Sequence, residues 1–294
     1  MKEEQMNILK SRKGFIAALD QSGGSSKKTL ANYGVNSYET EEEMFEQIHK
    51  MRSRIIKSKV FNKDRILGVI LFQNTVDRKI DDEFTADYLW NQKKILSFLK
   101  IDLGLEEEKD GVQLLKNIPN LEQILKNAQN KHIFGTKMRS VIKEVNEKSI
   151  EKLVEQQFYL AKKISSFGLI PIIEPEVDIY AIEKFGCEQI LIKCIKKQLD
   201  NLDENIKVIF KFTLPEKENF YDELLNYPQV LKIVALSGGY SQQKANQLLK
   251  LNKNMIASFS RALLENLNVL LTEEEFDNIL NQTIQNIYDA SINK

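Results

Sequence analysis

The sequence predicts a single (β/α)8 barrel, an α/β fold in which eight parallel strands form a closed sheet inside a ring of helices. Eight short apolar runs alternate with longer amphipathic segments along the 294 residues, and this alternation is typical of the barrel. No Gly-x-Gly-x-x-Gly follows the first run and no P-loop motif occurs, so the competing doubly wound open sheet lacks its usual signatures. No linker, low-complexity stretch or internal repeat divides the chain, and we expect one domain over residues 1–294.

The expected strands are short runs rich in β-branched and aromatic residues. In order, they are Gly14–Asp20, Ile66–Phe72, Phe98–Asp102, Ile133–Arg139, Leu169–Val177, Val208–Leu214, Leu231–Ser237 and Met255–Arg261. The segments between and after them carry apolar residues at helical spacing. These predict helices over Glu41–Lys57, Leu121–Gln129, Ser149–Ser165, Ile182–Leu199, Ser241–Leu251 and Glu273–Asp289.

Composition excludes several classes of protein. The 42 basic and 42 acidic side chains cancel, which argues against general binding to nucleic acid or to an acidic membrane. The apolar stretches are too short to span a bilayer, and the first residues lack the apolar segment of a signal peptide, so we expect a cytoplasmic protein.

Cysteine and histidine are scarce. Cys187 and Cys194 fit no zinc or redox spacing, which predicts plain reduced thiols. His49 and His132 are too few for a three-histidine metal site. We therefore expect no metal and no other cofactor.

Three of the first four expected strands carry charges near their carboxyl ends. The first ends at Asp20 and the second is apolar throughout. The third carries Lys100 and Asp102, and the fourth carries Lys137 and Arg139, each pair two residues apart. Side chains two apart share one face of a strand. Because helices cover the outer face, each pair is expected inside the barrel or at its mouth.

The last four strands continue this pattern. Glu174 and Glu176 share a face of the fifth strand, and Lys211 lies within an otherwise apolar sixth strand. Ser237 ends the seventh strand and Arg261 the eighth. A desolvated lysine beside other cations loses its proton more easily, which frees the amine to form a Schiff base with a carbonyl compound.

A structural role is the alternative for these charges. Lys211 alone, or a single pair such as Lys100 with Asp102, could be a buried ion pair with no chemistry. Nine inward charges on six strands are harder to explain in this way, since burying each ion costs on the order of several kcal/mol. Carboxyl ends of barrel strands are also where such folds place catalysis. The excess of cations in the set suits an anionic substrate.

Two glycine-containing loops extend the predicted site. Gly238 and Gly239 follow Ser237, and a Gly-Gly pair lies between Ser22 and Ser25 after the first strand. Glycine lets backbone N–H groups approach a phosphate. Each pair alone is more often a turn. Together with Arg261 and Lys100, the loops predict two anion sites across one pocket.

Several short motifs lie at the ends of the expected strands. They are Ala18-Leu19-Asp20 with its serine-glycine loop, Leu99-Lys100-Ile101-Asp102, Gly135-Thr136-Lys137-Met138-Arg139, Pro171-Ile172-Ile173-Glu174-Pro175-Glu176, the strand around Lys211, Leu236-Ser237-Gly238-Gly239 and Phe259-Ser260-Arg261-Ala262. In these motifs, and over nearly the whole chain, the sequence resembles the class I, Schiff-base fructose-1,6-bisphosphate aldolases of the short bacterial branch.

The resemblance implies a role for each catalytic residue. Lys211 would form the imine, and Glu174 would shuttle protons during its formation. Glu176 would hold Lys211 and Lys137 in place. Asp20 would take the proton of the C4 hydroxyl as the C3–C4 bond breaks, with Lys137 stabilising the charge there.

The resemblance also implies how the substrate phosphates are bound. The residues that would bind the dihydroxyacetone-phosphate half are Ser237, Gly238, Gly239 and Arg261. Those that would face the other phosphate are Ser22, Ser25 and Lys100. Arg139 is expected to contribute to substrate binding.

The sequence departs from the animal enzymes of this family at three places. Met138 stands where they carry tryptophan, and Ser260 stands where they carry glycine. Their C-terminal tyrosine, which helps to protonate the enamine, has no counterpart at the end of this sequence, and Tyr288 is a candidate only by its proximity to the terminus.

The sequence raises three possible functions for the protein. The resemblance implies reversible cleavage of fructose 1,6-bisphosphate in glycolysis and gluconeogenesis, with a sugar phosphate as the only small-molecule partner and assembly into a homo-oligomer. Another ketose bisphosphate, such as the C4 epimer tagatose 1,6-bisphosphate, is an open alternative. A phosphate-binding barrel without turnover would predict a broken set of charges, and the set is complete.

Overall fold

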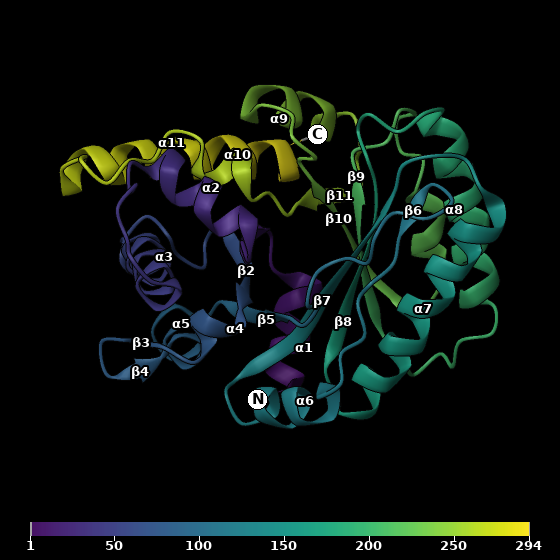
Figure 1. Cartoon of the computed structure of the whole chain (residues 1–294), viewed down its shortest axis with the longest axis horizontal. Helices are drawn as coiled ribbons and strands as arrows, with labels where there is room; N and C mark the ends of the chain where they lie inside the picture. The colour runs from purple at the N-terminus through teal and green to yellow at the C-terminus, as the bar shows by residue number, and fades with distance from the viewer. Residues whose placement is uncertain (1, 294) are drawn as a thin grey trace.

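The computed structural model describes residues 2–293, and its central feature is a parallel sheet of eight strands arranged in sequence order (Figure 1). The strands are β1 (Phe15–Leu19), β2 (Ile66–Phe72), β5 (Leu96–Lys100), β7 (Ile133–Ile142), β8 (Ile170–Val177), β9 (Val208–Thr213), β10 (Val230–Leu236) and β11 (Met255–Ala257). The backbone N–H of Ala18 in β1 donates to the carbonyl of Phe259, just after β11, at 3.1 Å. This contact joins the two edges, and the predicted (β/α)8 barrel is confirmed.

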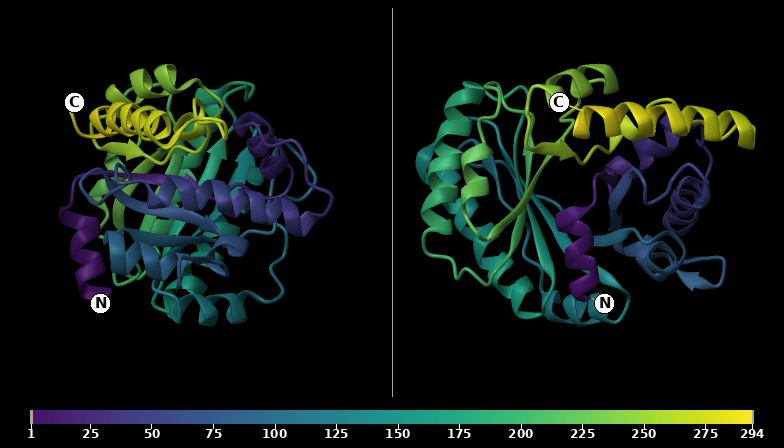
Figure 2. Two further views of the ribbon diagram at one scale, coloured as in Figure 1. Left: turned by 90° about the vertical axis from the view of Figure 1, so that its left-hand side faces the viewer. Right: turned by 180° about the vertical axis from the view of Figure 1, so that it is seen from behind.

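Helices surround the sheet (Figures 1 and 2). The helices that follow β1 in the chain are α2 (Gly24–Tyr33), α3 (Glu41–Lys57), α4 (Gln73–Val76), α5 (Thr85–Lys93), α6 (Leu121–Gln129), α7 (Glu147–Ser166), α8 (Lys184–Leu199), η1 (Asp222–Asn226), α9 (Gln242–Lys250), α10 (Arg261–Leu264) and α11 (Glu273–Ile292). Figure 1 shows α7 and α8 on one side of the strands and α3 and α11 on the other. Within residues 2–293, no helix combines the length and the apolar character that a membrane span requires.

The N-terminal helix α1 (Lys2–Ser11) covers the amino-terminal end of the barrel. Its Leu9 is fully buried in the cluster of side chains that fills the barrel interior. Lys2 Nζ donates to the carbonyl of Gly168, and Arg12 Nη1 donates to that of Lys94. These two carbonyls lie just before β8 and β5, so α1 leaves only the opposite end of the barrel open.

Two layers of apolar side chains share the strands. The inner layer packs inside the barrel and includes Phe98 and Phe134, whose rings meet edge to face at 5.6 Å. The outer layer packs between strands and helices. At Gly135 a Cβ would lie 2.1 Å from the carbonyl oxygen of Ile170. Only glycine therefore allows β7 to approach β8 this closely.

The observed boundaries correct some expected ones. The eighth strand ends at Ala257, not at Arg261, because the chain turns after Ser258 into α10, which Arg261 begins. The fourth strand runs to Ile142, beyond Arg139, because the short strand β6 (Val112–Gln113) pairs with its extension.

Several elements have no counterpart among the expectations. They are α1, α2, α4, α5, α10, η1, β6 and a hairpin of β3 (Lys79–Ile80) and β4 (Glu83–Phe84). The expected helices Glu41–Lys57 and Leu121–Gln129 are confirmed at both ends.

Candidate active site

A pocket of about 480 Å³ opens at the carboxyl ends of the strands. All predicted site residues line it except Gly239, which lines the adjacent cavity together with Arg261. Except for β2, every strand of the barrel contributes one of them, either from the strand itself or from the loop or helix that follows it. The sheet order brings together groups far apart in the chain, from Asp20 after β1 to Arg261 after β11.

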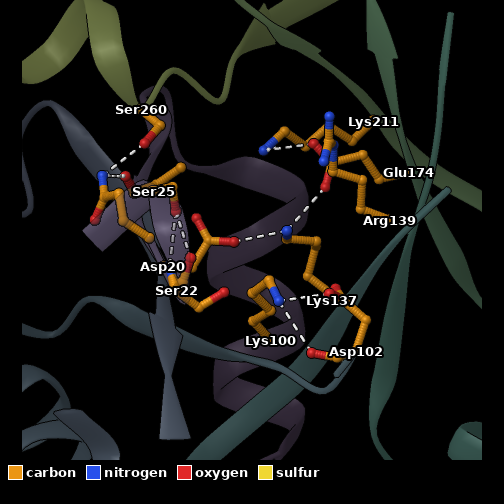
Figure 3. Close-up of polar contacts among 12 residues, drawn as sticks. Asp20, Ser22, Ser25, Lys100, Asp102, Lys137, Arg139, Glu174, Lys211 and Ser260 are labelled. Atoms are coloured by element: carbon orange, nitrogen blue, oxygen red, sulfur yellow. Dashed lines mark hydrogen bonds and ion pairs between the residues drawn. The ribbon is translucent and has the colours of Figure 1, made fainter. Parts of the chain in front are cut away.

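Four buried charged groups form a continuous row across the pocket floor (Figure 3). Lys211 Nζ lies 3.0 Å from Glu174 Oε1, and Glu174 Oε2 lies 2.9 Å from Lys137 Nζ. Lys137 Nζ lies 2.6 Å from Asp20 Oδ2. All four side chains are less than 10% exposed. The row therefore joins β9, β8, β7 and the end of β1 through contacts short enough for proton transfer.

Burial and neighbouring charges have opposite effects on the pKa values of Glu174, Asp20 and Lys137. Burial favours the neutral form of Glu174, but the charges of Lys137 and Lys211 outweigh it and lower the pKa of that carboxyl. Burial also opposes ionisation of Asp20, and the charges of Lys137 and Lys211 again lower its pKa. For Lys137, burial is outweighed by Asp20 and Glu174, which raise its pKa. At neutral pH both carboxylates are ionised and Lys137 is protonated.

Glu176 has a different partner from the expected one. Its Oε2 accepts a hydrogen bond from Arg139 Nε, and the charge of Glu176 outweighs burial and raises the pKa of Arg139. Glu174 contacts both Lys211 and Lys137 instead. The expectation that Glu176 holds Lys211 and Lys137 is therefore wrong, because Glu174 makes both contacts and Glu176 contacts Arg139.

The reason is strand register. Ile173 of β8 lies opposite Phe210 of β9. The next level therefore pairs Glu174 with Lys211, and Glu176 lies two residues further along β8. In β7, Arg139 is in register with Glu174, and its side chain reaches along the strand direction to Glu176.

The loop after β10 has the geometry of an anion site. Gly238 and Gly239 have φ angles of +63° and +113°, and a Cβ on Gly238 would lie 2.6 Å from Ile179 Cγ2. Glycine is therefore required at position 238. The guanidinium nitrogens of Arg261 lie about 3.5 Å from where a Gly239 Cβ would be. Ser237, Gly238 and Arg261 thus line one pocket, and Gly239 and Arg261 line the adjacent cavity.

A second polar region lies across the pocket, after β1. Ser22 N–H donates to Ser25 Oγ at 2.9 Å, and Ser25 Oγ donates back to the Ser22 carbonyl at 2.7 Å. Lys100, on β5, donates to the carboxylate and to the carbonyl of Asp102. The predicted pair of anion sites on opposite walls is therefore compatible with this geometry.

Sequence reasoning missed several residues of this region. Gln21, Lys28 and Ser260 line the pocket as well. Arg52 lies behind it, fully buried on α3. The sequence contains a signal for Arg52. Residues 44, 48, 51, 52 and 55 form one face of the predicted helix, and Arg52 is the only charged residue on that otherwise apolar face.

Groups that could bind a metal do not gather in residues 2–293, where no cluster of three or more His, Cys, Asp and Glu side chains occurs. His49 contacts the Lys79 carbonyl, and His132 contacts Asp87. Burial raises the pKa of the Cys187 and Cys194 thiols to about 11 each, which makes them poor nucleophiles at neutral pH. Activity without a metal stays a prediction.

Comparison with known proteins agrees with this architecture. The family model for fructose-bisphosphate aldolase class-I matches residues 1–205. The fructose-bisphosphate aldolase class 1 of Clostridium acetobutylicum is 57% identical over 294 residues, 99% of this chain and all of the relative.

The comparison with solved structures agrees with the barrel fold. A solved structure of fructose-bisphosphate aldolase from Plasmodium falciparum has a TM-score of 0.74 and 17% identity, and the match covers 98% of this chain and 94% of that one. At this identity the likeness concerns the fold. The family model and the high identity to a full-length relative carry the assignment: this chain belongs to the class I fructose-bisphosphate aldolase family.

Proposed function

We propose that this protein cleaves fructose 1,6-bisphosphate reversibly into dihydroxyacetone phosphate and glyceraldehyde 3-phosphate, through a Schiff base on Lys211. The observation that carries the proposal is the position of the Lys211 amine. It is buried at the floor of a pocket of about 480 Å³ and lies 3.0 Å from a carboxylate oxygen of Glu174. A primary amine in such a place can attack a ketone that enters the pocket.

Imine formation requires proton transfers that Glu174 can perform. Lys211 attacks the C2 carbonyl as the free amine, and the proton it gives up goes to a neighbouring base. The resulting carbinolamine loses its hydroxyl as water after that hydroxyl is protonated. Glu174 lies between Lys211 and Lys137, so it can accept the first proton and return one to the leaving oxygen.

Bond cleavage uses the other end of the row. Asp20 takes the proton of the C4 hydroxyl, the C4–O pair forms the aldehyde, and the electrons of the C3–C4 bond move into the protonated imine to give an enamine. Lys137, 2.6 Å from Asp20, stabilises negative charge at this point. Glu176 holds Arg139 at the wall of the pocket, and Arg139 contributes to substrate binding.

The two phosphates bind on opposite walls. Ser237, Gly238, Gly239 and Arg261 bind the phosphate next to the ketone, because β10 lies beside β9, which carries Lys211, and β11 lies beside β10. Ser22, Ser25 and Lys100 bind the phosphate of the aldehyde half. A complete set of these groups disfavours a phosphate-binding barrel without turnover.

The setting of the enzyme follows from this reaction. Its role is in glycolysis and gluconeogenesis, in the cytoplasm, and its partner is a sugar phosphate. Residues 1–294 act as one domain, and copies of the chain assemble into a homo-oligomer. Activity requires neither a metal nor another cofactor. Fructose and tagatose bisphosphates differ only in configuration at C4, and paired assays with the two compounds decide between them.

Trapping the imine tests the central step. Borohydride reduction in the presence of dihydroxyacetone phosphate should attach the adduct to Lys211, and peptide mapping by mass spectrometry locates it. EDTA should leave turnover unchanged. An adduct on Lys100 or Lys137 would overturn the assignment, and loss of activity with EDTA that zinc restores would indicate a metal-dependent reaction.

A further inference from the structure

Arg52 is a buried cation outside the row of charges that performs the proposed reaction. It lies on α3, is 1% exposed and is the largest fully buried side chain among the described residues. Within residues 2–293 no carboxylate lies within 4.0 Å of it. Burying a charge without such a partner is costly, on the order of several kcal/mol. An apolar side chain would fill the same face of α3 at lower cost, so the arginine requires another explanation.

The hydrogen bonds of Arg52 join two elements. Nη1 donates to Thr75 Oγ1 of α4 at 2.6 Å. Nη2 donates to the backbone carbonyl of Gln21 at 2.7 Å and to its side-chain Oε1 at 3.0 Å. The planar guanidinium can span these three oxygens at once, which the single ammonium of a lysine cannot do in the same way. Both the backbone and the side chain of Gln21 are thereby held.

Gln21 in turn connects two parts of the active site. It follows Asp20 directly, so its backbone position determines where the Asp20 carboxylate lies. Its Nε2 donates to Ser260 Oγ at 2.6 Å and to the Ala18 carbonyl at 3.3 Å. Ser260 immediately precedes Arg261. One glutamine side chain therefore links the end of β1 to the segment after β11, where the barrel closes.

We propose that Arg52 is a positioning residue of the active site, which holds Gln21 so that Asp20 and the Ser260–Arg261 segment keep their relative positions. This inference rests on the roles proposed above for Asp20 and Arg261. Burial lowers the pKa of Arg52 to about 9, and the guanidinium therefore stays charged at neutral pH.

Kinetics of four variants test the proposal. Arg52→Met removes the three hydrogen bonds while filling a similar volume. It should lower kcat, because Asp20 is displaced, and raise KM for the bisphosphate, because Arg261 is displaced. A combined loss in kcat/KM of about 10- to 100-fold is expected from a displacement of this kind. Gln21→Leu should behave similarly. The double variant should be no slower than the slower single one, because both changes break the same linkage.

The matched control is Arg54→Met, two residues along the same helix. Arg54 also makes several hydrogen bonds, to Tyr33 and to carbonyls of residues 268–271, away from the row of charges. It should lower the melting temperature and leave kcat and KM within about twofold of the wild type, as expected for residues without a role in the site.

The borohydride assay separates this proposal from the proposed reaction. Arg52→Met should trap dihydroxyacetone phosphate on Lys211 to the wild-type extent at saturating ligand, because Gln21 has no contact with Lys211 or Glu174. Failure of the wild type to trap would contradict the reaction itself.

Wild-type kcat and KM in folded Arg52→Met, or losses that multiply in the double variant, would overturn the positioning role. If Arg52→Met does not fold, Arg52→Lys replaces it. Arg52→Lys keeps the positive charge but lacks the planar guanidinium that spans the three oxygens. Wild-type kcat and KM in Arg52→Lys would equally overturn the proposal.

Discussion

Glu174 is the residue on which the proposed chemistry depends most. Its two oxygens contact two different ammonium groups, Oε1 that of Lys211 and Oε2 that of Lys137. Burial raises its pKa, and these two charges more than compensate. In the proposed reaction Lys211 becomes an imine, which changes the group next to Oε1, whereas Oε2 faces Lys137. A carboxylate in this position can therefore hold or release a proton as the charge on Lys211 changes.

Substitutions of Glu174 and Asp20 should affect different steps. Glu174→Gln removes the shuttle, so imine formation and dehydration should slow by about 10²–10⁴-fold. Asp20→Asn removes the base for the C4 hydroxyl. It should leave imine formation possible while cleavage slows by about the same factor. Rapid-quench borohydride trapping during a single turnover of fructose 1,6-bisphosphate measures the two steps separately.

Early trapping should be high in Asp20→Asn and low in Glu174→Gln. Equal amounts of trapped imine in the two variants at early times would contradict this division of roles. Glu176→Gln is the useful comparison, because Glu176 lies on the same strand but contacts Arg139 instead of Lys211.

At the scale of elements, most of the proposed phosphate contacts come from the loops and helices that follow the strands. The loop after β10 needs glycine at position 238 because Ile179 occupies the space of a Cβ. Arg261 reaches the same loop from the start of α10. The loop after β1 continues into α2 at Gly24 and faces Lys100 of β5 across the pocket. The two anion sites therefore belong to different pairs of elements, and they can be tested independently.

Removing each cation should change substrate preference in a distinct way. Charge-assisted contacts to phosphate contribute roughly 1.5–3 kcal/mol each. Arg261→Ala should therefore weaken fructose 1-phosphate and the bisphosphate by similar factors. Lys100→Ala should penalise only the bisphosphate, because fructose 1-phosphate lacks the second phosphate. Steady-state kcat/KM for both substrates checks this. An equal loss for both substrates in Lys100→Ala would remove Lys100 from the second phosphate site.

At the scale of the whole molecule, the two ends of the barrel have different roles. Helix α1 covers the amino-terminal end, and the pocket occupies the other end. The inner and outer apolar layers share the same strands, and the strands link the first third of the chain to the last through Ala18 and Phe259. If any strand unfolded, apolar side chains of both the inner and the outer layer would be exposed to water. This favours unfolding of the barrel as one unit.

The chain should consequently unfold in one transition. Trp90, the single tryptophan, is buried on α5 and reports on the first third of the chain. Far-UV circular dichroism reports on the whole chain. Urea unfolding curves from the two signals should coincide, as expected for a two-state transition. Separate midpoints would indicate that the N-terminal third unfolds independently and would contradict the single domain.

Local patterns were sufficient for much of the architecture. Alternating apolar runs and amphipathic segments predicted all eight strands of the barrel and their order, because sequential parallel strands joined by helices have few alternative arrangements. The ends were less accurate. Arg261 was placed in a strand although it begins a helix. Helix α1 was missed because its charged sequence shows little apolar periodicity, and only burial of Leu9 in the barrel explains its position.

The sequence by itself determined which charged residues face the interior, since two-residue periodicity and the covering helices leave no other place for Lys137, Glu174 or Lys211. Only the tertiary structure decided which of these charges meet. Glu174, not Glu176, contacts Lys211 because the register between β8 and β9 sets their levels. Arg52 reaches Gln21, 31 residues away, and Gln21 reaches Ser260, 239 residues away. Such contacts depend on how the barrel closes, and closure is a property of all eight strands together and not of any local pattern.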